Sequence, residues 1–272
     1  MDFIDKTLAR RLEAAEELPQ VRYVELYQEL WPDVKAVSAE ICAGHMCYCG
    51  ADSPIGRAVG LGLERELKQD DLERVEEFYH SRGVPAQIDV TPLHDGAVFE
   101  LLRQRGYGIA ELNNVLWRRL RHDDTYPEQV GGFEIRQGTS NEADSFAEIA
   151  ARCFDEQGEH SEEFHRMLAP LFRMPGAVSF MATVAGQPAA VGSGLIIPDY
   201  KIVALFGAGT LPEFRRRGIQ TSLLVERLKL AAEADCEIAV IVTQGGTLSQ
   251  RNAERLGFRV AYSKATMVKQ GG

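Results

Sequence analysis

Long apolar segments are missing from this sequence of 272 residues. No run approaches the roughly 18 consecutive apolar residues that a membrane-spanning helix needs. The first twenty residues, MDFIDKTLARRLEAAEELPQ, mix both signs of charge along an amphipathic pattern and contain no apolar signal core. We therefore expect a cytoplasmic protein that does not engage a membrane.

Cysteine is scarce as well. The five cysteines form an odd number, which fits a reducing compartment better than a framework of disulfides. Three of them, Cys42, Cys47 and Cys49, surround His45 in the stretch CAGHMCYC, a grouping that raises the question of zinc. A four-ligand structural site normally uses two separated ligand pairs, and no second pair follows. We interpret these residues as buried strand cysteines and expect no metal.

Positive charge is in deficit. The formal net charge of −10 would repel the backbone of DNA or RNA, so it argues against a nucleic-acid-binding protein. Hydrophobic residues make up 45% of the chain and charged residues 26%, as in globular proteins. The length suffices for one large domain or two of ordinary size.

One basic stretch stands out against this acidic background. Residues 204–224, ALFGAGTLPEFRRRGIQTSLL, combine an apolar strand, a turn at Pro212, a basic loop and the start of a helix. A helix start exposes unpaired N–H groups and the positive end of the helix dipole, and Arg215, Arg216 and Arg217 add charge beside it. The pattern predicts a pyrophosphate site, and the alternative is a basic helix start that forms only surface salt bridges. Apolar residues at helical spacing predict that one face of this helix packs on a core: Ile219, Leu223, Leu224, Leu228, Ala231 and Ala232.

The same residues resemble a known motif. Arg215, Gly218 and Gln220 are similar to the Gln/Arg-x-x-Gly-x-Gly/Ala loop of the GCN5-related N-acetyltransferases (GNAT proteins), with Gln220 in place of the usual small residue. The resemblance implies an α/β (α+β) fold, with a mixed, largely antiparallel sheet flanked by helices. It also implies acetyl-CoA as co-substrate, acyl transfer to an amine, and a strand before the loop whose N–H groups bind the thioester and pantetheine. The residues expected to bind the cofactor are Ala208, Gly209, Thr210, Leu211, Arg215, Arg216, Arg217, Gly218, Ile219, Gln220, Thr221, Ser249 and Asn252.

Helix and strand patterns alternate along the rest of the chain. Residues 2–17 and 20–30 are predicted as two helices broken at Pro19, and residues 57–63 as a strand. Asp70 is the expected N-cap of the next helix.

A linker is predicted near the middle of the chain. Residues 122–132, HDDTYPEQVGG, are polar and contain a proline and two glycines. This predicts two domains, residues 1–124 and residues 125–272. Three further helix starts are expected at Asp95, Asn141 and Ser161.

The two halves resemble diverged copies of each other. Gly106 ends the last helix of the first half as Gly257 ends that of the second, and Gly60-Leu-Gly62 matches Gly207-Ala-Gly209. The first half is shorter at the position of the basic loop, where it has the sequence ERELKQD. We interpret it as a degenerate GNAT-like domain without a cofactor loop; the alternative is a chance likeness between α/β patterns.

The sequence indicates the catalytic residues less directly than the cofactor-binding residues. In many relatives of this family, a tyrosine lies four residues before the Gly-Phe that ends the last helix, and this sequence has Ala253 there. Tyr262, on a closing strand, is the candidate general acid, with a structural role as the alternative. His160, in an acidic connection between two helices, is the candidate base, because its ordinary pKa suits proton transfer at neutral pH. The alternative is a solvated acidic loop.

These expectations lead to one favoured function and two alternatives. The favoured function is transfer of an acetyl group from acetyl-CoA to a primary amine of a small molecule or peptide, by direct attack, in a monomer or homodimer. The missing tyrosine supports the alternative of a non-catalytic acyl-CoA-binding or sensing protein. The third class is a structural interaction module, which would have no affinity for coenzyme A.

Overall fold

The computed structural model describes residues 3–51, 53–94, 96–129, 131–154 and 162–270. Contacts divide the chain into two compact units. The first comprises Met1–Val115, Thr243–Gly245 and Val260–Gly272, and the second comprises Leu116–Val242 and Gly246–Arg259. The expected domains, 1–124 and 125–272, rest on the predicted linker, and these contacts do not test them. None of the helices in the described ranges is long and apolar enough to cross a membrane.

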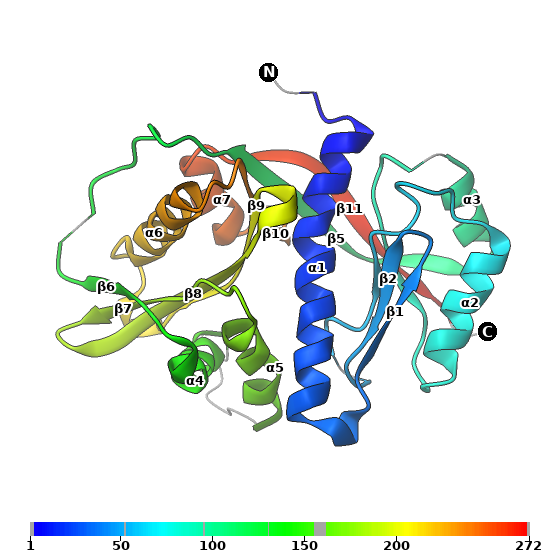
Figure 1. The fold of residues 1–272 in the computed structure, drawn as a ribbon, viewed down its shortest axis with the longest axis horizontal. Coiled ribbons are helices and arrows are strands. Elements are labelled where there is room, and N and C mark those ends of the chain that lie inside the picture. The colour runs from blue at the N-terminus through cyan, green and yellow to red at the C-terminus, as the bar shows by residue number, and fades with distance from the viewer. Residues whose placement is uncertain (1–2, 52, 95, 130, 155–161, 271–272) are drawn as a thin grey trace. The chain divides into compact units, whose positions relative to one another are not determined.

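The first unit combines helices with a mixed sheet (Figure 1). Its helices are α1 (Lys6–Leu30), α2 (Gln69–His80) and α3 (Gly96–Gln104), and its strands are β1 (Val37–Ile41), β2 (Gly44–Tyr48), β3 (Ala58–Val59), β4 (Gln87–Val90) and most of β5 (Tyr107–Arg119) and β11 (Arg259–Lys269). The order β1-β2-β3-β4-β11 is antiparallel except for the parallel pair β3–β4.

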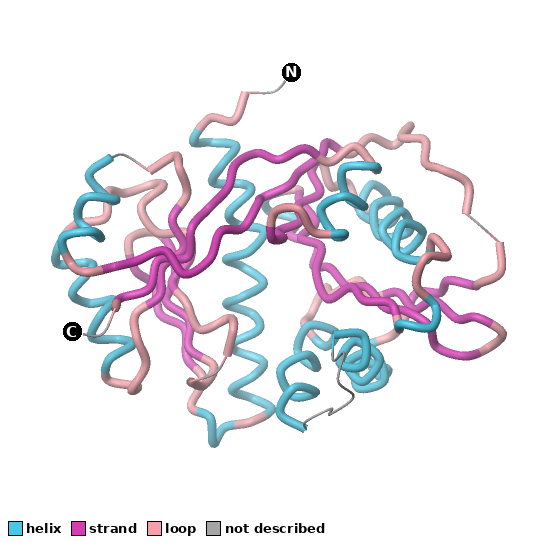
Figure 2. The backbone as a smooth tube through the Cα atoms, turned by 180° about the vertical axis from the view of Figure 1, so that it is seen from behind, coloured by secondary structure: helices cyan, strands magenta, loops and turns pink. Residues whose placement is uncertain are grey.

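Helix α1 runs without a break through Pro19, so the predicted division into two helices is wrong (Figures 1 and 2). Proline removes a backbone donor and crowds the preceding turn. Packing compensates, because Leu12, Tyr23 and Val24 are buried and the helix lies against β1 and β2. The side chain of Asp5 caps the helix by accepting from the N–H of Leu8 at 2.8 Å.

Two other local predictions need correction. The strand predicted over residues 57–63 is limited to Ala58–Val59, because Gly60 and Gly62 adopt left-handed φ values of 72° and 76°. The N-cap of α2 is Lys68 rather than Asp70, and Asp71 accepts from the Lys68 N–H at 3.1 Å. The expected start at Asp95 lies outside the described residues.

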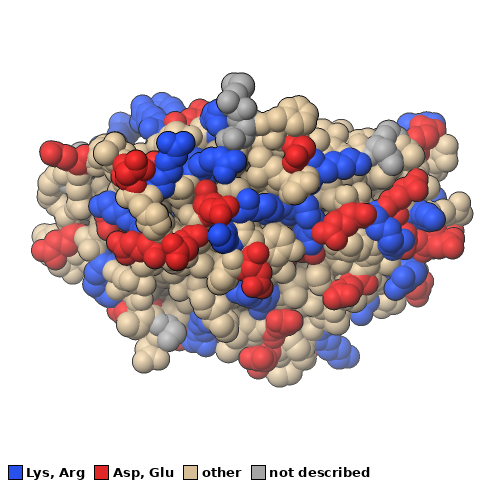
Figure 3. Space-filling view, turned by 45° about the horizontal axis from the view of Figure 1, so that its top comes forward, with Lys and Arg blue, Asp and Glu red and all other residues tan. Residues whose placement is uncertain are grey.

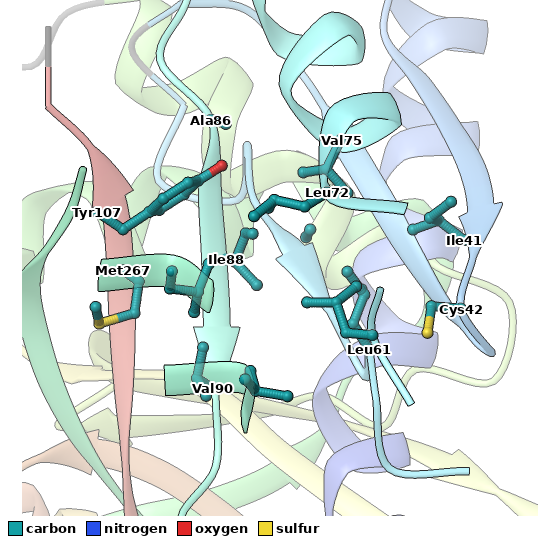
Figure 4. Close-up of a cluster of buried hydrophobic side chains, with 14 of the residues drawn as sticks. Ile41, Cys42, Leu61, Leu72, Val75, Ala86, Ile88, Val90, Tyr107 and Met267 are labelled. Atoms are coloured by element: carbon teal, nitrogen blue, oxygen red, sulfur yellow. The ribbon is translucent and has the colours of Figure 1, made fainter. Parts of the chain in front are cut away.

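The core of the first unit lies between its sheet and helices α2 and α3 (Figure 4). Ile88 and Val90 of β4 pack with Leu72 and Val75 of α2 and with Met267 of β11. This apolar cluster explains why β4 and β11 pair although they are far apart in the sequence.

A cluster of buried charges lies beside that core. Lys264 of β11 is 1% exposed, and its Nζ lies 3.2 Å from Glu13 Oε2 and 3.4 Å from Asp89 Oδ2. It also pairs with Glu16. Burial alone would lower the pKa of Lys264, but the three carboxylates outweigh it and raise that pKa. The cluster therefore keeps Lys264 charged in the interior.

The start of α2 is closed by its own side chains. Arg65 donates to both carboxylate oxygens of Asp71, at 3.0 and 2.8 Å. These bonds, together with the Lys68 N–H, hold the pKa of Asp71 below its ordinary value, although burial opposes them.

The second unit contains the basic loop. Its strands are β6 (Glu134–Gln137), β7 (Phe180–Val184), β8 (Gln187–Ile197), β9 (Ile202–Thr210) and β10 (Ile238–Gln244), and its helices are α4 (Ala143–Phe154), α5 (Glu162–Arg173), α6 (Ile219–Glu233) and α7 (Leu248–Arg255). The order is β10-β9-β8-β7-β6, with β9 and β10 parallel and the other pairs antiparallel. Helices α4 and α5 pack on one face of β8 and β9, and α6 packs on the other (Figure 1).

Helix α6 presents the predicted apolar face to the core. All six residues predicted from the helical spacing are at most 9% exposed, so that prediction is confirmed.

Helix α4 begins at Ala143, after a 3-10 turn over Ser140–Glu142, rather than at Asn141. The expected start at Ser161 lies outside the described residues. On the face shown in Figure 3, basic and acidic side chains are interspersed.

Replacing Lys264 tests the buried charge cluster. We expect Lys264→Met to lower the free energy of unfolding by about 3–5 kcal/mol, because Glu13, Glu16 and Asp89 would lose their shared partner in the interior. Urea unfolding would measure the loss. The control is Lys269→Met on the same strand, where a half-exposed lysine pairs with Glu76 and the cost should stay below about 1 kcal/mol. Equal effects of the two changes would contradict the proposed importance of burial.

A second prediction concerns the pH dependence of the α2 start. Because the folded-state pKa of Asp71 is lowered, its stabilisation is present above the unfolded value of 3.8 and is lost as the pH falls through the folded value. Asp71→Asn should cost about 1 kcal/mol at pH 7. The difference from wild type should shrink below about pH 4 in urea unfolding. Asp70→Asn, at the exposed neighbouring carboxylate, should cost little at any pH, and the reverse order would restore Asp70 as the capping residue.

Candidate functional site

Strand β9 separates from β10 along its second half. Ile202, Val203 and Ala204 pair with Ile238, Ala239 and Val240, and the pairing ends there among the described residues. From Leu205 to Thr210, β9 is still bonded to β8 on its other side. Its backbone groups on the β10 side are thus available to an extended ligand, as an added strand would use them.

A bulge lies within the open part of β9. Val191 pairs with Gly209 and Ser193 pairs with Phe206, so the two residues Gly207 and Ala208 oppose the single residue Gly192. Gly207 has a left-handed φ of 59°, the conformation that such a bulge requires of its first residue. Gly207 is therefore the residue whose conformation permits the bulge.

Gly209 allows α4 to approach β9 closely. A Cβ atom at Gly209 would lie 2.4 Å from Cβ of Cys153, the penultimate residue of α4. Any side chain at this position would push the helix away from the strand. The sequence pattern identified this glycine but not its partner Cys153, because a contact between distant segments leaves no local signal.

The arginine loop (residues 211–218) connects β9 to α6. Arg215 turns back to the protein, since its Nε donates to the carbonyl of Thr210 and its Nη2 donates to the carbonyl of Cys153, each at 3.2 Å. Arg216 is exposed and left-handed, with a φ of 66°, and the exposed Arg217 lies over the ring of Phe214 at 5.5 Å. Arg215 therefore fixes the loop, while Arg216 and Arg217 present charge to solvent.

Helix α6 begins without a side-chain cap. Gly218, at the N-cap, has a φ of 80°, and none of the described side chains accepts a hydrogen bond there. The N–H groups of Ile219, Gln220 and Thr221 belong to the first turn, which has no carbonyl partners inside the helix. With the helix dipole and two exposed arginines, this start is suited to an anion such as a diphosphate.

An orphaned hydroxyl marks the junction of strand and loop. The Oγ1 atom of Thr210 is buried and has no hydrogen-bond partner among the described residues. Buried hydroxyl groups are normally paired. A polar ligand along β9 would supply the missing partner, so the residues present fit a ligand that follows the strand and ends in phosphates.

The other predicted residues lie on different elements. Ser249 and Asn252 lie one turn apart on α7, Ser249 exposed and Asn252 half-buried, and their contact with a cofactor stays a prediction. Ala253 is fully buried in the core. His160 lies outside the described residues.

Tyr262 belongs to the first unit by its contacts. Its hydroxyl donates to Glu13 Oε1 at 2.8 Å, and the residue is 7% exposed. Burial, the Glu13 charge and this bond all raise the pKa of Tyr262. These surroundings hold the proton on the phenol and support the structural alternative.

Replacing Thr210 tests the orphaned hydroxyl. We expect Thr210→Val to leave the melting temperature unchanged or slightly higher, because the hydroxyl group that is removed makes no hydrogen bond among the described residues. Thr266→Val is the matched control, since Oγ1 of Thr266 donates to Asp89 at 2.7 Å and its loss should cost about 2 kcal/mol. A loss at Thr210 as large as that at Thr266 would show that the hydroxyl is already bonded.

Comparisons with known proteins agree with this geometry. Residues 143–258 match the model of the acetyltransferase (GNAT) family. No curated protein sequence matches the chain. A GCN5-related N-acetyltransferase from Kribbella flavida is 14% identical, with a TM-score of 0.65 over 92% of this chain and 96% of that one.

Two further solved structures share the fold. A tandem GNAT protein from the clavulanic acid biosynthesis pathway is 13% identical, with a TM-score of 0.62 over 84% of this chain and 79% of that one. A GCN5-related N-acetyltransferase from Sphaerobacter thermophilus is 18% identical, with a TM-score of 0.57 over 74% of this chain and 67% of that one. The chain therefore carries a domain of the acetyltransferase (GNAT) family at residues 143–258, and over most of its length it has the fold of GNAT proteins.

Proposed function

We propose that the second unit binds acetyl-CoA and transfers its acetyl group to a primary amine of a small molecule or peptide. The observation that carries this proposal is the uncapped start of α6 at Gly218, which the arginine loop connects to the open, bulged half of β9. The family match over residues 143–258 supports the same reaction class.

Different segments of the second unit would bind different parts of acetyl-CoA. The open backbone of Leu205–Thr210 would pair with the amides of the pantetheine arm, and Thr210 Oγ1 would gain its missing partner. The first-turn N–H groups of α6, with Arg216 and Arg217, would hold the diphosphate. The bulge at Gly207 and Ala208 turns backbone N–H groups out of the ladder, where they are suited to stabilise the oxygen of the thioester during attack.

The first unit lacks the corresponding features. Its parallel pair β3–β4 is linked by α2, as β9–β10 is linked by α6, but the α2 start is occupied by the Asp71 carboxylate and Arg65. A Cβ at Gly60 would lie 2.5 Å from the Glu17 carboxylate, which occupies the space beside that strand. We therefore propose that the first unit is a degenerate partner that binds no coenzyme A.

A non-catalytic acyl-CoA-binding protein is the second candidate. It is favoured by the buried Ala253 at the position of the family's tyrosine and by the bond between Tyr262 and Glu13. Both candidates require acetyl-CoA binding, and only the first requires turnover.

Isothermal titration with acetyl-CoA tests the binding. We expect Arg217→Glu to weaken binding at least tenfold, or about 1.4 kcal/mol, because a carboxylate would replace a cation beside the phosphates. The control Arg103→Glu makes the same change of charge at an exposed position on α3 and should leave the affinity within twofold. Equal affinities of Arg217→Glu and wild type would show that the arginine loop does not contribute to acetyl-CoA binding.

Thiol release separates the two candidates. Wild-type protein and acetyl-CoA would be incubated with a panel of small amines and amine-bearing peptides, and free coenzyme A would be measured. Amine-dependent release supports the transferase, whereas tight binding without release across the panel supports the binding protein.

A further inference from the structure

Arg227 of α6 is an arginine in the interior of the second unit. It is 3% exposed, and burial lowers the pKa of its guanidinium to about 10, so the group is charged at neutral pH. No acidic side chain of the described residues offsets this lowering. A buried charge without a counter-ion is costly, and the binding scheme above does not use it.

The hydrogen bonds of Arg227 connect α6 to strand β8 beside the bulge. Its Nη1 donates to the carbonyl of Ser193 at 2.8 Å, and its Nε donates to the carbonyl of Leu223, one turn earlier on α6, at 3.1 Å. Ser193 is the residue of β8 at which the pairing with β9 shifts register. A bulge disrupts the regular ladder, and here a charged donor holds a carbonyl at its edge.

The absence of a side chain at Gly192 leaves space for the guanidinium of Arg227. A Cβ atom there would lie 2.9 Å from Cζ and 3.1 Å from Nε of Arg227. Gly192 is also the single residue that opposes the two bulge residues, Gly207 and Ala208. Arg227 therefore lies against the one position of β8 that faces the bulge.

We propose that Arg227 is a positioning residue for acetyl transfer: it clamps β8 at Gly192 and Ser193 and so holds the bulge of β9 in the form that receives the thioester. This inference rests on the proposed function, because it assigns Arg227 to the same strand. Arg227 acts through the backbone and does not touch the substrate.

Two measurements on Arg227→Met test the proposal. The variant keeps an unbranched side chain but loses the charge and the donors. We expect the Kd for acetyl-CoA to rise at least tenfold at a temperature where the protein is folded. Without ligand, amide hydrogen exchange of residues 205–209 should accelerate at least tenfold. Arg227→Lys, which keeps the charge and one donor group, should restore part of both losses.

Leu228→Ala is the matched control, since Leu228 is the next residue of α6 and is fully buried in the core. It should lower the melting temperature at least as much as Arg227→Met, yet leave the Kd within twofold and the exchange of residues 205–209 near that of wild type. Equal effects of the two variants on Kd and exchange would reduce Arg227 to a packing residue and overturn the proposal.

Gly192→Ala gives a second route if Arg227→Met does not fold. The added methyl group would displace the guanidinium, so the Kd and the exchange should rise as for Arg227→Met, and unchanged values would overturn the proposal. Should the wild type bind no acetyl-CoA, the proposed function fails. The exchange comparison between Arg227→Met and Leu228→Ala then still decides whether Arg227 holds β9.

Discussion

The separation of β9 from β10 after Ala204 and Val240 is the constraint on which the second unit depends. A strand inside a sheet normally has both edges paired, and an open edge within a fold leaves backbone groups that need partners. The neighbouring features all keep β9 in place without β10: β8 on its other side, Cys153 against Gly209, and Arg215 bonded to the carbonyl of Thr210. The candidate site therefore combines an open strand edge with neighbours that hold the strand in place.

The two units differ in how the first-turn N–H groups of a corresponding helix are satisfied. Both α2 and α6 follow a strand and lead to a parallel neighbour, and both expose N–H groups at their first turn. In α2 the chain supplies its own anion, Asp71, which Arg65 holds in place. In α6 the N-cap is Gly218 with a left-handed φ, none of the described side chains caps the helix, and the proposed anion would be a ligand. The Asp71 side chain is thus the difference between the capped start of α2 and the uncapped start of α6.

Sequence patterns predicted what is local. The buried face of α6 follows from the spacing of its apolar residues, and the basic loop before Gly218 follows from the run of three arginines. Features that depend on packing between distant segments were not predictable. Pro19 is tolerated because buried side chains of α1 outweigh the lost bond, and the bond from Tyr262 to Glu13 joins residues at opposite ends of the chain. The Gly192-Ser-Gly194 pattern in β8 did carry a signal, since glycines in an apolar strand indicate close approach by another element.

The placement of β11 has a consequence for synthesis. Residues 260–269 complete the sheet of the first unit beside β4 and supply Lys264 to Glu13, Glu16 and Asp89. On a ribosome, these residues emerge after the entire second unit has been made. Until then the nascent first unit has an unpaired edge at β4, and Glu13 lacks its lysine, so the sheet and the charge cluster are incomplete. The unit that is translated first therefore gains its full native sheet only after the second unit has been made, in contrast to domains that are continuous in the sequence.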